Sequence, residues 1–74
     1  MIMKKILLLD NDLLSRAWAI GGERYLNKMA TFARRDGFVL AVADVVDYEI
    51  SKGPNGKYIS NWLISSNVDV IETA

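Results

Sequence analysis

Two continuous apolar runs, each followed at once by an aspartate, restrict the folds open to this chain more than any other feature. The first run covers residues 6–9 and stops at Asp10, and the second covers residues 38–43 and stops at Asp44. A strand that is apolar at every position is typical of a parallel sheet with both faces covered. We therefore predict two buried parallel strands, each of which ends at an acidic residue.

The segment between the two runs has the apolar spacing of helices. Apolar residues recur at helical intervals over residues 13–18 and again over residues 26–33. The glycine pair at 21–22 separates the two stretches, so two helices are expected. Asn11 or Asp12 is the expected cap of the first helix, because short polar side chains accept the free N–H groups of a first turn.

The second half of the chain repeats this alternation. Asp44 is predicted to cap a helix over residues 45–50, and the Gly-Pro-Asn-Gly sequence at 53–56 predicts a loop. A further helix face follows over residues 59–63, and residues 68–71 predict a short third strand. The order β-α-α-β-α-α-β predicts a single α/β domain over residues 1–74, a three-layer fold with a short parallel sheet of about three strands flanked by helices.

Composition removes several kinds of chemistry. The chain has no histidine and no cysteine, which excludes conventional zinc sites, disulfides, and triads that use an imidazole base. Nine basic and nine acidic residues cancel, so binding of nucleic acid by the whole surface is not expected, although a local patch stays open. The apolar run at residues 6–9 is too short for a signal peptide or a membrane span. We expect a cytoplasmic protein that does not enter the membrane.

Carboxylates are therefore the leading candidates for polar chemistry. Asp10 and Asp44 follow predicted strands, and ligands of open parallel sheets bind outside the carboxyl ends of the strands. Glu49 lies on the next helix and could converge with Asp10, where Mg²⁺ or Mn²⁺ would suit oxygen ligands. For Asp44 and Asp12 a role as helix cap is favoured over a role as ligand. For Asp10 a functional role is favoured, because placing a carboxylate at the end of a buried strand costs desolvation free energy.

Aromatic and basic residues are open to two interpretations. Trp18 and Trp62 fall on apolar helix faces, so core packing is favoured over stacking on nucleic-acid bases. Lys28, Arg34 and Arg35 could contact phosphate groups, but a solvated helix end explains them as well.

Two segments resemble the PIN-type nucleases. Residues 6–15 are similar to the opening of that family, an apolar strand followed by Asp, a small polar residue and an apolar pair. Residues 42–50 resemble its second motif, in which an acid, usually Glu, lies in the helix after the second strand. The resemblance implies a Mg²⁺- or Mn²⁺-dependent nuclease that cuts RNA, and many members are toxins of bacterial toxin–antitoxin pairs. It also implies that Asp10 and Glu49 are catalytic metal ligands, and that Asp12 takes the place of a supporting Asn near the metal.

The resemblance covers the first half of a PIN domain only, so a truncated PIN-like domain is expected. The family's remaining acids lie in its second half, which makes the metal site incomplete in one chain. In the family the first strand lies inside the sheet, and truncation would leave the strand from Ile6 to Leu9 as an open edge. We expect a homo-oligomer or a partner protein to cover it. The alternatives are a non-catalytic, PIN-derived interaction module, and a fragment with no independent role.

Overall fold

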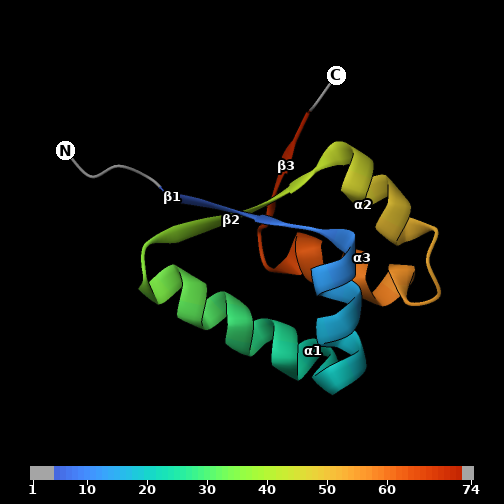
Figure 1. Ribbon diagram of the computed structural model, residues 1–74, viewed down its shortest axis with the longest axis horizontal. Helices are drawn as coiled ribbons and strands as arrows, with labels where there is room; N and C mark the ends of the chain where they lie inside the picture. Colours follow the sequence, from blue (N-terminus) through green and yellow to red (C-terminus); the bar gives the residue numbers. More distant parts are fainter. Residues whose placement is uncertain (1–4, 73–74) are drawn as a thin grey trace.

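Three strands and three helices follow one another in the computed structural model, which describes residues 5–72 (Figure 1). Every strand pairing is parallel, so the predicted α/β class and the parallel sheet are confirmed. The elements are β1 (Lys5–Leu9), α1 (Asn11–Arg35), β2 (Phe38–Ala43), α2 (Asp44–Ser51), α3 (Gly56–Ser65) and β3 (Asp69–Ile71).

The sheet has the strand order β1-β2-β3, so β2 is central. In β1 and β2 the register pairs Leu9 with Val42, and in β2 and β3 it pairs Ala43 with Ile71. Within residues 5–72, β1 therefore has one unpaired side, in agreement with the expected open edge. An unpaired strand presents free N–H and C=O groups to a further strand.

The hydrophobic core lies on one face of this sheet. Leu9, Leu40 and Val42 are almost completely buried, and the strand register places Leu9 beside Val42. Side chains from all three helices join them in one cluster, and Figure 1 shows α1 and α3 on the same side of the strands. The helical members of the cluster are Leu14, Ala17, Leu26, Ala30, Ile50, Ile59, Trp62 and Leu63.

The opposite face of β1 is open, and the prediction that this strand is buried on both faces was wrong. Ile6 is 58% exposed and Leu8 is 59% exposed. The reason is topological. Both crossovers step to the next strand in the same direction, and right-handed crossovers then place their helices on the same face.

Helix α1 is bent at Gly22, where the sequence predicts a break between two helices. Gly22 has φ 60° and ψ −146°, a backbone conformation that is not helical and that favours glycine. Figure 1 shows the two halves of α1 running in different directions, with the first half leaving the end of β1. The second half ends before Gly37, whose φ of 86° is a conformation that glycine adopts easily just after a helix.

The start of α3 also differs from expectation. The predicted loop at residues 53–56 is shorter, because Gly56 is already the first residue of α3. Gly56 is buried, and a Cβ atom on it would lie 2.1 Å from the carbonyl oxygen of Ile50. Only glycine fits this close approach between the end of α2 and the start of α3.

Candidate functional site

An acidic residue follows each of the three strands at the same end of the sheet. Asp10 follows β1, Asp44 follows β2 and Glu72 follows β3. Continued by one residue, the register places Asp10 opposite Ala43 and Glu72 opposite Asp44. Neighbouring strands lie about 4.8 Å apart. We call these three residues the acidic edge; it is the end of a parallel sheet at which ligands usually bind.

Asp10 has the structural role that was predicted for its neighbours Asn11 and Asp12. Asp10, not Asn11 or Asp12, is the N-cap of α1, and its Oδ1 accepts the backbone N–H of Leu13 at 2.7 Å. The side chain is exposed, so the argument from desolvation does not apply to it. The cap bond uses Oδ1, and a carboxylate has a second oxygen with which it can bind a cation.

Asp44 starts α2 rather than preceding it. The N-cap position belongs to Ala43, which makes no side-chain cap bond, so the predicted cap was misplaced by one residue. The Oδ1 of Asp44 accepts the N–H of Val45 at 2.7 Å. An acid in the first turn also suits the positive end of the helix dipole.

The other two predicted site residues lie on helices beside this edge. Asp12 lies in the first turn of α1 and pairs with Arg16 at 3.2 Å, and both side chains are largely exposed. Glu49 is exposed on α2, next to the buried Ile50. Among residues 5–72 no group of three or more acidic side chains gathers closely enough to hold a metal ion. The structure thus brings Asp10 and Asp12 to the start of one helix but forms no closed ligand set with Glu49.

The donor chemistry of this edge suits a hard cation. Its side chains offer carboxylate oxygens, and Mg²⁺ and Mn²⁺ prefer oxygen ligands. Mg²⁺ commonly takes one or two protein carboxylates and fills the rest of its octahedron with water and substrate phosphates. The residues therefore fit a weak, open cation site, and a tight site needs further ligands from outside them.

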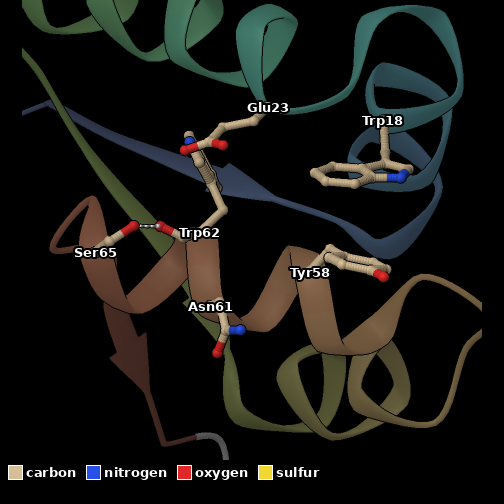
Figure 2. A pocket seen from close by; sticks show the side chains of 6 residues that line it. All are labelled: Trp18, Glu23, Tyr58, Asn61, Trp62 and Ser65. Atoms are coloured by element: carbon tan, nitrogen blue, oxygen red, sulfur yellow. Dashed lines mark hydrogen bonds between the residues drawn. The ribbon is translucent and has the colours of Figure 1, made fainter.

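A second feature is an aromatic cleft between α1 and α3, shown in Figure 2. The ring of Trp18 stacks on that of Tyr58 with centroids 5.6 Å apart, and Glu23 extends over the same hollow. Trp62 is 3% exposed, and its Nε1 donates to Oδ1 of Asn27 at 2.7 Å. The two contacts fasten the two halves of α1 to α3. The cleft measures about 290 Å³, at the lower limit for a small-molecule site.

Both tryptophans were predicted to pack in the core, and Trp62 is buried there. Trp18 is half-buried and packs against the same core cluster, and its ring also stacks on the exposed Tyr58. No signal in the sequence pairs these two rings, since they are 40 residues apart and belong to different helices.

Three comparisons with known proteins gave no match: no family model, no curated protein and no solved structure matches the chain. The resemblance to PIN domains therefore stays a prediction that depends on residues 6–15 and 42–50. None of the helices in residues 5–72 is long and apolar enough to cross a membrane.

Proposed function

We propose that this chain carries part of a Mg²⁺- or Mn²⁺-dependent ribonuclease site of the PIN type. The single observation that supports the proposal is the parallel register, which brings Asp10 and Asp44 to the ends of adjacent strands. Helix α2 starts at the same end of the sheet and carries Glu49. Asp10 and Glu49 are the proposed metal ligands, and Asp12 supports them beside Asp10.

Asp10 and Glu49 would hold the metal ion, and the chemistry it would supply is the activation of water and the stabilisation of charge on a phosphodiester during hydrolysis. The role of this chain is to hold carboxylate oxygens in place. Asp10 is fixed by its cap bond to Leu13, which orients the carboxylate at the end of β1. Because residues 5–72 hold no complete ligand set, we propose that the remaining oxygen ligands come from water and the substrate phosphate, or from a second copy or another polypeptide.

The test is a titration with Mg²⁺ and Mn²⁺ followed by two-dimensional amide NMR, with the oligomeric mass measured on the same sample. Saturable shifts centred on Asp10 and Glu49 are expected, and they should vanish in Asp10→Asn and Glu49→Gln. Asp36→Asn and Glu23→Gln are the matched controls, since these exposed acids lie outside the acidic edge. No shift at millimolar metal in the folded chain would exclude the catalytic proposal.

A second candidate function is a non-catalytic interaction module, and the open face of β1 favours it. Ile6 and Leu8 are each more than half exposed, on the strand whose outer edge has no partner among residues 5–72. A strand or helix from a second copy would cover these side chains, and it would add the third layer that the sequence predicts. Such association would also cover an apolar strand edge that otherwise promotes aggregation.

The mass measurement separates this second candidate from the first. A concentration-dependent dimer that dissociates in Leu8→Lys, together with no response to metal, would support the interaction module. The variant Lys57→Glu changes an exposed charge on α3 and should leave the mass unchanged. A monomer at high concentration would contradict association between copies.

A further inference from the structure

The outer face of the second half of α1 carries two adjoining hollows. One is lined by Tyr25, Lys28, Met29 and Phe32, and the other shares Tyr25 and Lys28 and adds residues of the bend. Because the two hollows share Tyr25 and Lys28, they adjoin along the helix, and the two together are called the groove here. This face does not belong to the acidic edge, and neither the metal ligands nor the aromatic cleft uses it.

Positive charge is concentrated along this groove. Residues 24–35 contain four basic side chains and no acid, although the whole chain has no net charge. Arg34 is engaged elsewhere, since its Nη2 donates to the carbonyl oxygen of Ser66. Arg24, Lys28 and Arg35 are exposed. Within residues 5–72 they take part in no ion pair, so their charge is not neutralised by a neighbouring carboxylate.

The three cations lie in one row. At 100° per residue, Arg24, Lys28 and Arg35 fall within about 40° of one another around the helix axis. The buried Leu26 and Ala30 lie on the opposite side, against the core. Lys28 lies four residues after Arg24, and Arg35 lies seven residues after Lys28. The row is therefore about 16 Å long from the first cation to the last.

Exposed aromatic rings form a second row beside the cations. Tyr25 is 42% exposed and Phe32 is 56% exposed, and their spacing of seven residues places them on the same face. Met29 lies between them in the wall of the groove. An exposed phenylalanine is unfavourable in water, and a flat apolar partner would remove that cost.

We propose that this groove, together with the row of cations along it, binds single-stranded nucleic acid; the surface of Arg24, Tyr25, Lys28, Phe32 and Arg35 is called the basic groove below. The cations contact the phosphate backbone, and the bases stack on Tyr25 and Phe32. A row of positive charge beside a row of aromatic rings is the chemistry that holds single strands without reading their sequence. The choice of RNA as ligand rests on the proposed nuclease function, whereas the groove itself rests on the charges and rings just described.

The test is fluorescence anisotropy with a fluorescein-labelled oligouridylate of about ten nucleotides. EDTA is included, so that metal binding and cleavage contribute nothing. Three phosphate contacts predict that log K falls with log salt concentration at a slope of about −2. Lys28→Glu is expected to weaken binding at least tenfold and to flatten this slope. The matched charge reversal Lys57→Glu, on α3 and outside the groove, should change the affinity less than twofold.

Stacking is tested separately from charge. Phe32→Ala removes an exposed ring and should weaken binding roughly tenfold while the salt slope stays the same. Equal effects of Lys28→Glu and Lys57→Glu would overturn the proposal, as would the absence of binding at low salt. Equal affinity for an oligoglutamate peptide would show a general anion surface, or a docking site for an acidic protein, and would also overturn it.

The two proposals fail in different ways. Binding of the oligonucleotide without any response to Mg²⁺ or Mn²⁺ would keep the basic groove and exclude the nuclease site. Shifts at Asp10 and Glu49 on addition of metal, without binding of the oligonucleotide, would keep the metal site and exclude the groove.

Discussion

The acidic edge and the basic groove differ in how the chain builds them. The basic groove comes from a single helical segment, in which every important residue lies within residues 24–35. The acidic edge comes from three strand ends that are up to 62 residues apart, and only the parallel register brings Asp10 and Glu72 to the same end of the sheet. One surface depends on helix periodicity, and the other depends on the tertiary fold.

This difference predicts how each surface responds to destabilising substitutions. The basic groove keeps its order of charges as long as the second half of α1 is helical. The acidic edge needs the sheet, and it also needs α2, which holds Asp44 and Glu49. A change that weakens packing between α2 and α3 should therefore affect the acidic edge first and the basic groove last.

The largest effect is expected from Gly56→Ala, which disturbs the packing of α3 against α2, the helix that carries Asp44 of the acidic edge. The new Cβ atom would lie 2.1 Å from the Ile50 carbonyl oxygen and 2.8 Å from backbone atoms of Ser51. Backbone atoms cannot move aside as a flexible side chain can, so the free energy of unfolding should fall by about 3 kcal/mol. Urea denaturation measures this loss, and hydrogen exchange should show α2 deprotected before α1.

Gly53→Ala is the control for that experiment, because the same backbone atom of Ile50 is 3.4 Å from its new Cβ. This distance is close to ordinary van der Waals contact. The free energy of unfolding should change by less than about 1 kcal/mol. Equal losses from the two substitutions would show that packing between α2 and α3 is not the cause.

The second effect is expected at Gly22, the bend that separates the start of α1 from the basic groove. Gly22→Ala meets no atom within 4 Å, so the whole cost is backbone strain at φ +60°. We expect a loss of about 1–3 kcal/mol in the free energy of unfolding. The bond from Trp62 to Asn27 should weaken as well, because alanine favours a straight helix here. A loss below a few tenths of a kcal/mol, measured by urea denaturation, would contradict the bend.

The bend is one of the features that the sequence predicts well. The break at the glycine pair 21–22 and the strands β2 and β3 follow from local sequence patterns. The open edge of β1 was expected only from the resemblance to the first half of a PIN domain. The exposure of Ile6 and Leu8 does not follow, because it depends on which face receives the helices. An apolar run of four residues is the same whether one face is covered or both.

The candidate site was predicted less completely, for a different physical reason. Asp10, Asn11 and Asp12 are all good N-cap residues, so composition does not decide which of them starts α1. The structure decides it in favour of Asp10, by the bond to Leu13. The place of Glu72 in the acidic edge cannot be read from the sequence, because it depends on the pairing of β3 with β2.

A third, smaller effect separates the two roles of Asp10. Asp10→Ala removes the cap bond and should lower the free energy of unfolding by about 1 kcal/mol. Asp10→Asn keeps an oxygen that can cap, so its loss should stay below about 0.5 kcal/mol, measured by urea denaturation. Both variants should lose the NMR response to metal. If Asp10→Asn keeps that response in full, Asp10 is a cap and nothing more.

The smallest effect is expected at Asp12, an exposed acid on α1 beside the acidic edge. Its ion pair with Arg16 spans one helical turn and is largely exposed to water. A double-mutant cycle of Asp12→Asn and Arg16→Gln should therefore give a coupling energy of no more than about 0.5 kcal/mol, and less at high salt. Asp12→Asn should also keep the metal response of Asp10, because an amide can replace a carboxylate that only supports the site. A lost response, in a variant that remains as stable as the parent, would make Asp12 a ligand of the same rank as Asp10.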